Sequence, residues 1–472
     1  MNASSLSLSL SSSFSLSQRL AAFVAETPAD VLPATVVHKT KRHILDTLGA
    51  SLGGATALEA RSARAVMGMG SSGSVTAWGT AQTFNARDAA FVNGVAAHAL
   101  ELDDAGGCDH SGAVVLPAAF AALACTERPV TGREFLMAVV LGYDAGRRVL
   151  EACGGYSPHN NHGWHSTMTC GVFGAAAASA RLLGLDAAQT AAAFGHAASF
   201  SGGLWGFIHD ASQTKRMHTG RAAEGGLLAA LLARQGVSGP TQVFEDVWGG
   251  FFNAFARDTQ IPDALLADLG VVWKLTRCSI KPHAACRSTH AAVDATFELL
   301  QGRAADLDKL VGVHVSLSAF VNQMCGGRDL STLASSQMSL PYAIATVLVN
   351  GHAGIGAYLD AQRRDPRIAA AMERVTLEID PSMSDLDEPV ITLALSDAEP
   401  RSRQVNVPLG DPRNPVSDAD LADKYRTLAA MTIPEASVNA LEIAVLDLEN
   451  LADARTLAHW LQGDADARPV VR

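Results

Sequence analysis

Cationic side chains cluster at the predicted start of an Ala/Leu-rich helix. Lys215 and His218 lie three residues apart and Arg221 follows, so helical spacing places them on about one face. Positive charge is unfavourable at a helix N-terminus, where the helix dipole is already positive, unless an anion binds there. With Ser212 or Thr214 as the expected N-cap, the segment predicts a carboxylate-binding site. An ordinary solvated helix start is the alternative.

A second cationic segment begins at Lys281 and contains Arg287 and His290. The proline after Lys281 is typical of the first turn of a helix, so we expect the segment to open one. Arg287 and His290 then share a helical face, and an arginine can hold a carboxylate through two parallel hydrogen bonds. The segment therefore predicts further groups that bind an anion.

Histidine precedes another predicted helix. His165 is followed by Ser166 and Thr167, which we expect to cap that helix. The partial positive charge of a helix N-terminus keeps a neighbouring His neutral, and a neutral His can act as a base. A structural role for this residue is the alternative. A metal centre made of His159, His162 and His165 is a further alternative, but no acidic ligand is near them and we expect no metal.

Three carboxylates, Glu101, Asp103 and Asp104, end a predicted helix that contains His98. A Gly-rich loop follows, and His110 then opens the next helix. Clustered carboxylates raise one another's pKa and can supply a general acid, although acidic residues also commonly decorate helix ends. Cations at three helix N-termini beside such a cluster indicate proton transfer next to a carboxylate of a small polyanion.

The elements that must position these residues are mostly helical. Apolar residues recur at helical spacing in six segments before residue 270: 31–53, 86–101, 131–151, 166–184, 187–200 and 215–235. After Gly270, strand-like alternation or β-branching marks five segments: 271–278, 311–320, 374–380, 390–397 and 403–410. Further helical runs lie near 287–302, 332–349, 417–430 and 434–462.

These patterns predict a mainly α fold with two domains. A large all-helical domain is built from both chain ends, residues 18–270 and 410–472, and a smaller α+β domain is inserted over 271–409. Residues 1–17 are expected to form a disordered Ser-rich tail.

Composition limits the partners. Hydrophobic residues make up 48% of the 472 residues, enough for a large core, and the net charge of −11 argues against nucleic acid or an anionic membrane as partner. No uninterrupted apolar stretch reaches the ~18 residues of a membrane-spanning helix. The first basic residue is Arg19, so a secretion signal is not expected, and seven cysteines without C-x-x-C spacing predict reduced thiols in a cytoplasmic protein.

Six segments in order resemble the MmgE/PrpD family, and the resemblance covers nearly the whole chain after the Ser-rich tail. They are ARDAAFVNGVAAHALELDD with the histidine that follows it, LGYDAGRR, GWHSTMTCGVFGAAAA, DASQTKRMHTGRAAEGG, SIKPHAACRSTHAAVDA and SQMSLPYAIA. The family includes 2-methylcitrate dehydratase, cis-aconitate decarboxylase and iminodisuccinate epimerase. The resemblance implies a homodimer that needs neither metal nor organic cofactor, with the active site in a cleft between the helical domain and a smaller α+β lid.

Position by position, the resemblance implies a pocket made by Glu101 (where an aspartate is common), His110, His165, Lys215 and Lys281. The acidic loop before His110 is slightly short.

Two positions depart from the decarboxylase pattern. Ala105 stands where a threonine is expected, and Cys286 stands where that branch has histidine. The resulting prediction takes His165, His110, Lys215 and Glu101 as catalytic, and assigns substrate binding to Lys281, Arg287, Asp103, Asp104, Cys286 and Tyr342.

The implied activity is that of a cytoplasmic, cofactor-independent lyase for a small di- or tricarboxylate, a hydro-lyase resembling 2-methylcitrate dehydratase. His165 would be the base and His110 the acid toward the leaving hydroxyl, oriented by Glu101, with the two histidine roles open to exchange. An iminodisuccinate epimerase-like isomerase is the nearest alternative. A cis-aconitate decarboxylase-like enzyme, a non-catalytic carboxylate-binding protein and a metal-dependent hydrolase are the others.

Overall fold

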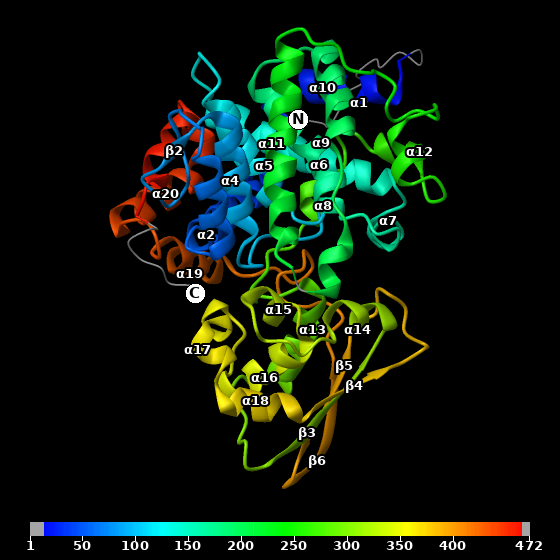
Figure 1. The fold of residues 1–472 in the computed structure, drawn as a ribbon, viewed down its shortest axis with the longest axis vertical. Helices are drawn as coiled ribbons and strands as arrows, with labels where there is room; N and C mark the ends of the chain where they lie inside the picture. The colour runs from blue at the N-terminus through cyan, green and yellow to red at the C-terminus, as the bar shows by residue number, and fades with distance from the viewer. Residues whose placement is uncertain (1–13, 211, 465–472) are drawn as a thin grey trace.

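The computed structural model describes residues 14–210 and 212–464, and helices make up most of them (Figure 1). Within these residues, the strands form a two-stranded ribbon, β1 (Val75–Thr76) and β2 (Thr83–Phe84), and one four-stranded sheet. The prediction of a mainly α fold with a small α+β part is confirmed. Most of the expected Ser-rich tail lies outside the described residues; within them, Ser15 already caps the first helix, which starts at Leu16.

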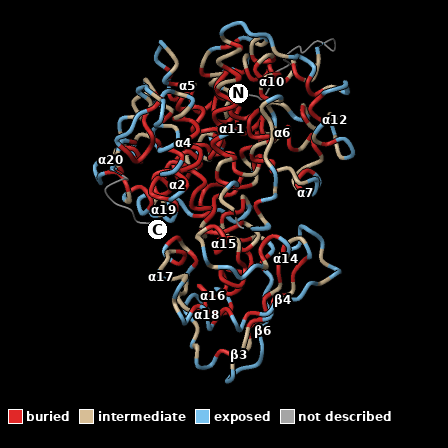
Figure 2. Tube along the Cα trace, in the orientation of Figure 1, coloured by how far each residue is buried: buried red, intermediate tan, exposed pale blue. Residues whose placement is uncertain are grey.

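The first part of the chain forms a helical layer. Its α-helices are α1 (Leu16–Glu26), α2 (Ala34–Gly54), α3 (Leu58–Met67), α4 (Ala86–His98), α5 (Ser111–Leu123), α6 (Gly132–Ala152), α7 (Tyr156–Asn161), α8 (Ser166–Thr169), α9 (Gly171–Leu182), α10 (Ala187–Phe200), α11 (Thr214–Arg234) and α12 (Phe251–Phe255). Short 3₁₀ turns are η1 (Trp205–His209), η2 (Pro262–Leu265) and η3 (Lys274–Arg277). Figure 2 shows the centre of this layer as buried, and every residue of α5 is buried, as expected for a helix that is apolar all round.

The second part holds the four-stranded sheet and the helices around it. Its elements are η4 (Arg287–Thr289), α13 (His290–Leu299), β3 (Leu310–Leu317), α14 (Ala319–Cys325), α15 (Leu333–Gln337), α16 (Leu340–Asn350), η5 (Ile355–Tyr358), α17 (Asp360–Arg363), α18 (Pro366–Glu373), β4 (Val375–Ile379), β5 (Val390–Leu395) and β6 (Ala398–Gln404).

The sheet has the strand order β4-β3-β5-β6, with β3 parallel to β4 and the other pairs antiparallel. Val315 on β3 is opposite both Leu377 and Ile391, which fixes the register. Residues of β3 alternate between buried and exposed because one face of the sheet packs on α13 and α16 and the other faces water. β6 lies at the edge of the sheet and is exposed along its length. Its charged side chains discourage pairing with a strand of another chain.

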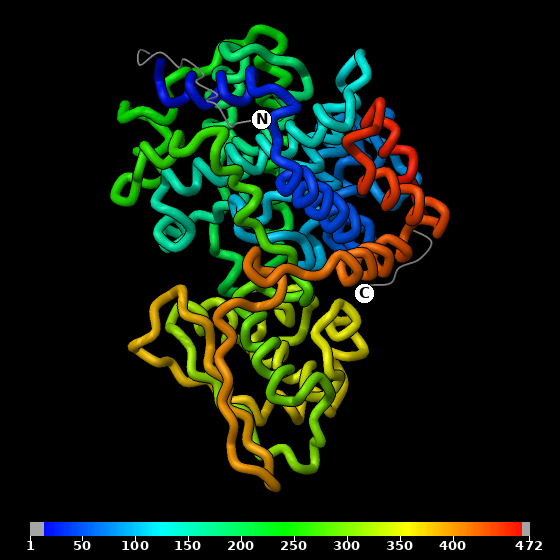
Figure 3. The backbone as a smooth tube through the Cα atoms, turned by 180° about the vertical axis from the view of Figure 1, so that it is seen from behind, coloured from blue at the N-terminus to red at the C-terminus, as the bar shows by residue number. Residues whose placement is uncertain are grey.

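The chain then returns to the helical layer through α19 (Asp418–Ala429) and α20 (Glu435–Leu446), followed by the 3₁₀ turns η6 (Leu448–Asn450) and η7 (Ala454–Leu461). Figure 3 shows α19 beside α2, along the seam between the two parts. On α19, Lys424 donates hydrogen bonds to Asp46 on α2 (2.5 Å) and to the carbonyls of Leu102 (2.6 Å) and Lys281 (2.8 Å). The end of the chain thus fixes two loops that carry predicted site residues.

Three local predictions were wrong. Residues 271–278 form turns and η3 instead of a strand, because buried Asp144 and Arg148 on α6 bind the Lys274 amide and the Val272 carbonyl and hold this segment on the helix. The last strand runs over 398–404 instead of 403–410, as a hairpin with β5. The expected helix over 166–184 is interrupted at Cys170.

None of the described helices is both long and apolar enough to span a bilayer.

Candidate active site

The predicted site residues can act together only if they share a space, and a cavity of about 190 Å³ lies where the loop after α4, the start of α11 and the segment before η4 meet. We call it the inner cavity. Its lining residues are Glu101, Ala105, Gly106, Gly107, Asp109, His110, Arg147, Tyr156, Trp205, Lys215, Lys281, Cys286, Arg287 and Ser288. Six of the ten predicted site residues are among them: Glu101, His110, Lys215, Lys281, Cys286 and Arg287.

Two lysines and one carboxylate form the floor of this cavity. Lys215 donates a hydrogen bond to Oε1 of Glu101, and Lys281 donates to Oε2 (3.1 Å) and to the Glu101 carbonyl (3.2 Å). All three side chains are buried. Burial alone would raise the pKa of Glu101, but Lys215 and Lys281 hold it well below its usual range. Two ammonium groups against one carboxylate leave a net positive charge that favours an anionic ligand.

From the sequence we expect Glu101 to orient His110, but Glu101 is bonded to the two lysines instead. The Nδ1 atom of His110 lies 3.0 Å from Oδ2 of Asp103 and 3.0 Å from the Asp104 carbonyl, and its Nε2 atom lies 3.5 Å from Oδ2 of Asp109. Burial lowers the pKa of His110, but Asp109 and Asp103 outweigh it and the pKa is raised. With Nδ1–H held by Asp103, a cationic His110 would present its Nε2 proton at the cavity wall.

Asp103 acts behind the cavity instead of lining it. Its carboxylate lies 2.9 Å from Nδ1 of His98 and also contacts His110, so it holds two adjacent imidazoles that are tilted by 45° with ring centroids 3.9 Å apart. Its pKa is well below the usual range: burial opposes ionisation, and the two histidines favour it. Asp103 holds the two histidines and does not line the inner cavity, so the expectation that it binds substrate does not fit the geometry.

Asp104 and Tyr342 do not line the inner cavity either, so the expectation that they bind substrate does not fit the geometry. Asp104 accepts hydrogen bonds from the Tyr143 hydroxyl (2.6 Å) and the Gly112 amide (2.9 Å), which turns it into the helical core. Tyr342 lies in the core of the second part and donates its hydroxyl proton to the Ala357 carbonyl (2.7 Å).

His165 is fully buried one layer behind the cavity wall. Its Nε2 atom lies 3.6 Å from Oδ2 of Asp109 and 3.2 Å from Oγ1 of Thr167, and its Nδ1 atom lies 2.8 Å from Nδ1 of His218. Burial lowers the pKa of His165 to about 3, so the ring is neutral. The ring of Trp205 packs edge-on against it, with ring centroids 5.0 Å apart.

The cap predictions near these residues were wrong. Neither Ser166 nor Thr167 caps α8, whose N-cap is His165 itself, and α11 starts at Thr214 with Gln213 as N-cap and no side-chain cap. The segment after Lys281 is irregular up to η4 because its backbone amides bind elsewhere: the Ala284 amide donates to Ala353 and the Cys286 amide to Gln337.

The other residues of the cationic segments have separate contacts. Arg221 is exposed and pairs with Glu224 (2.7 Å), and His290 is buried with Nε2 3.2 Å from the Ala285 carbonyl. Arg287 keeps its place at the cavity and donates a hydrogen bond to Glu388 (3.0 Å).

Asp109 is a cavity residue that sequence reasoning missed. Its carboxylate lies between the Nε2 atoms of His110 and His165, and the three residues bring their polar atoms within one small space. Its φ of 94° is a left-handed conformation that costs a non-glycine residue about 1–3 kcal/mol, and Glu101 has a φ of 52°. Strained residues of this kind concentrate at functional sites. The only signal in the sequence was its place directly before His110.

The three histidines considered as an alternative metal centre do not converge. His159 turns toward Thr169, with Nε2 2.7 Å from its Oγ1, and His162 is exposed, so they do not converge with His165. Two other groups bring three potential ligand atoms within 4.8 Å of one another: His98, Asp103 and His110, and Asp109, His110 and His165. In both groups every residue already has a hydrogen-bond or ion-pair partner within the cluster, which suits an acid–base network.

Comparison with known proteins gives consistent matches along the chain. The family model of the MmgE/PrpD N-terminal domain matches residues 18–263, and that of the MmgE/PrpD C-terminal domain matches residues 283–450. The cis-aconitate decarboxylase-like protein oryM of Aspergillus oryzae is 31% identical over 467 residues, covering 93% of this chain and 95% of that protein. Cis-aconitate decarboxylase of Aspergillus terreus is 30% identical (92% and 93% covered), and that of Homo sapiens is 28% identical (91% and 90% covered).

Proposed function

Because the chain belongs to the MmgE/PrpD family, we propose that it is a lyase that moves a proton at a carbon next to a carboxylate of a small di- or tricarboxylate. The observation that carries the proposal is that Lys215, Lys281 and His110, from three distant parts of the chain, line one cavity of about 190 Å³. A cavity of this size suits a small acid, and its buried cations suit more than one carboxylate.

Substrate carboxylates would bind to Lys215, Lys281 and Arg287. Each lysine can donate hydrogen bonds to Glu101 and to the substrate at the same time, since an ammonium group has three N–H donors. They also lie where negative charge develops when a proton leaves the neighbouring carbon, and so would stabilise the enolate-like intermediate. Glu101 keeps both lysines charged and in place.

The two histidines would divide the proton transfers. Neutral His165 would accept the proton from carbon, and cationic His110 would donate its Nε2 proton to the departing hydroxyl, which leaves as water. Environments that push two pKa values apart in this way are typical of acid–base pairs. Asp109 contacts both Nε2 atoms and covers His165, so substrate must displace its carboxylate to reach the base.

This division of roles supports a hydro-lyase resembling 2-methylcitrate dehydratase. A cis-aconitate decarboxylase-like reaction is the second candidate, favoured by the names of the similar proteins. In it, the carboxylate would leave as CO₂ and His110 would protonate the carbon left behind. Ala105 and Cys286, which depart from the decarboxylase pattern, both border the inner cavity and weigh against this candidate.

One experiment separates these reactions. The purified chain is incubated in heavy water with 2-methylcitrate, citrate, cis-aconitate and iminodisuccinate, and products are followed by nuclear magnetic resonance. Loss of hydroxyl with formation of an alkene supports the hydro-lyase, release of CO₂ supports the decarboxylase, and deuterium uptake with loss of configuration supports the epimerase. Binding without any turnover, abolished by Lys215→Met, would indicate a carboxylate-binding protein instead.

A cytoplasmic location, a homodimer and independence from metal remain predictions. Light scattering of the purified chain tests the dimer, and activity after treatment with a chelator tests the metal.

A further inference from the structure

A second cavity, which we call the outer cavity, lies beside the inner one and has a volume of about 350 Å³. Trp205 lines both cavities. The Met324 sulfur on the outer wall lies 3.6 Å from Sγ of Cys286, which lines the inner cavity. The two spaces are therefore separated by single side chains.

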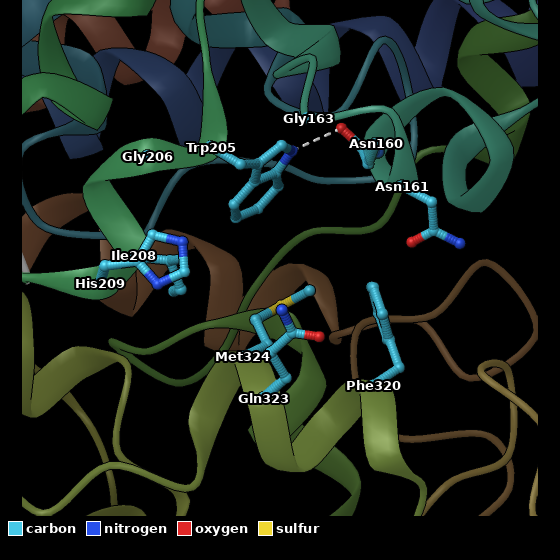
Figure 4. Close-up of a pocket in the computed structure, with 10 residues that line it drawn as sticks. All are labelled: Asn160, Asn161, Gly163, Trp205, Gly206, Ile208, His209, Phe320, Gln323 and Met324. Carbon is cyan, nitrogen blue, oxygen red and sulfur yellow. Dashed lines mark hydrogen bonds between the residues drawn. The ribbon is translucent and has the colours of Figure 1, made fainter.

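The outer cavity differs from the inner one in charge. None of its lining residues is Lys, Arg, Asp or Glu, whereas the inner cavity holds buried ions. Figure 4 shows Trp205 and Asn160 along one side and Phe320, Gln323 and Met324 opposite them. Aromatic, thioether and neutral amide groups thus face the space together with the exposed imidazole of His209, and no lysine or arginine lines it to hold a bound carboxylate.

The Trp205 wall is fixed in place. Its indole N–H donates a hydrogen bond to Oδ1 of Asn160 (2.7 Å), and its backbone amide donates to the Gly163 carbonyl (3.0 Å). The preceding turn is held as well, because the His165 amide donates to the Gly203 carbonyl (3.1 Å). Since the indole N–H already has a partner, the ring offers its apolar surface to a ligand.

We propose that the outer cavity is a specificity subsite for an uncharged alkyl branch of the substrate. The preferred substrate would then be a small polycarboxylate whose carboxylates bind in the inner cavity and whose branch, longer than a methyl group, passes Trp205. This inference rests on the proposed function, which places the carboxylates. Each buried methylene strengthens binding about fourfold, whereas a carboxylate buried there without a cation is costly.

Binding of non-reacting diacids tests the subsite without relying on a particular reaction. Calorimetry would compare succinate, 2-butylsuccinate and a 2-substituted succinate of similar length whose branch ends in a carboxylate. We expect butylsuccinate to bind at least tenfold more tightly than succinate, and the carboxylate-ended analogue to lose that gain.

A matched pair of variants locates the effect. Gly206 lines the outer cavity but not the inner one, and a Cβ added there meets no atom within 4 Å. Gly356 is likewise an exposed glycine at the second position of a 3₁₀ turn with open space at its Cβ, and it lines neither cavity. Gly206→Leu should fill the outer cavity, abolish the gain from the butyl group and leave succinate affinity within twofold. Gly356→Leu should behave as wild type.

Affinity that does not depend on the branch, or a Gly206→Leu variant that weakens succinate and butylsuccinate equally, would overturn the inference and make the outer cavity an access path. Failure of the proposed function has a different signature: succinate binding that Lys215→Met leaves unchanged, or no succinate binding at all. Either result would show that carboxylates do not bind in the inner cavity, and the subsite inference would then be wrong as well.

Discussion

Replacing Glu101 by glutamine removes the carboxylate that lies between two buried lysines. Glu101 is fully buried and bonded to Lys215 and Lys281, so Glu101→Gln leaves two ammonium groups without their counter-charge. Removing one partner of a buried ion pair typically costs about 3–5 kcal/mol of stability. We expect a loss of this size at pH 7, measured by denaturant unfolding followed through tryptophan fluorescence.

The pH dependence of this loss follows from the lowered pKa of Glu101. A carboxyl whose folded pKa lies below its unfolded value contributes stability above the unfolded pKa of about 4.3, and that contribution is lost as pH falls through the folded pKa. The difference between wild type and Glu101→Gln should therefore be full at neutral pH and shrink below about pH 4.3.

A bound dicarboxylate should partly replace the missing charge. Succinate is expected to stabilise Glu101→Gln more than wild type. The exposed ion pair of Glu298 with Arg403 provides the control, because Glu298→Gln should cost no more than ~1 kcal/mol and respond to succinate as wild type does. If Glu101→Gln is as stable as the Glu298→Gln control, and succinate stabilises both equally, the reasoning about the two lysines is refuted.

Three further predictions concern other residues. Lys281→Met should raise KM about 10–100-fold, because a charge-assisted hydrogen bond to substrate is lost. The control variant Lys309→Met, at an exposed ion pair of the second part, should leave KM unchanged. Equal KM values for the two variants would show that Lys281 does not bind substrate. His110→Asn should lower kcat ~10²–10⁴-fold. The rate of the wild type should fall at alkaline pH with a pKa above 6.5, because His110 must be protonated to act as the acid. If the remaining activity of His110→Asn still falls at the same alkaline pH, another group is responsible for that fall. Tyr342→Phe should cost ~1 kcal/mol of stability and leave kcat/KM within twofold, and a large fall in kcat/KM without unfolding would return Tyr342 to the site.

Much of the helical architecture could be predicted because burial requires apolar residues at helical spacing. The helices predicted over 187–200 and 215–235 correspond closely to α10 and α11. The prediction failed where a tertiary contact decided the backbone: residues 271–278 have the pattern of a strand, but hydrogen bonds to Asp144 and Arg148 hold them as turns. No local pattern reveals such partners.

The residues of the candidate site could likewise be predicted only where a local sequence pattern marks them. Lys215, Lys281 and His110 stand out as charged residues in apolar surroundings, and all three line the inner cavity. Asp109 and Trp205 could not be selected in this way, because their importance depends on a left-handed backbone and on hydrogen bonds between distant loops. Asp104 was selected wrongly for the opposite reason: it belongs to the acidic cluster in the sequence, but its carboxylate faces the core.

A crystal structure of the chain soaked with a non-reacting tricarboxylate such as tricarballylate tests the central claim most directly. We predict that its carboxylate oxygens lie within hydrogen-bond distance of Nζ of both Lys215 and Lys281, with one end of the molecule near His110. Tricarballylate bound elsewhere, with the Glu101–lysine contacts unchanged and the inner cavity filled only by water, would contradict it.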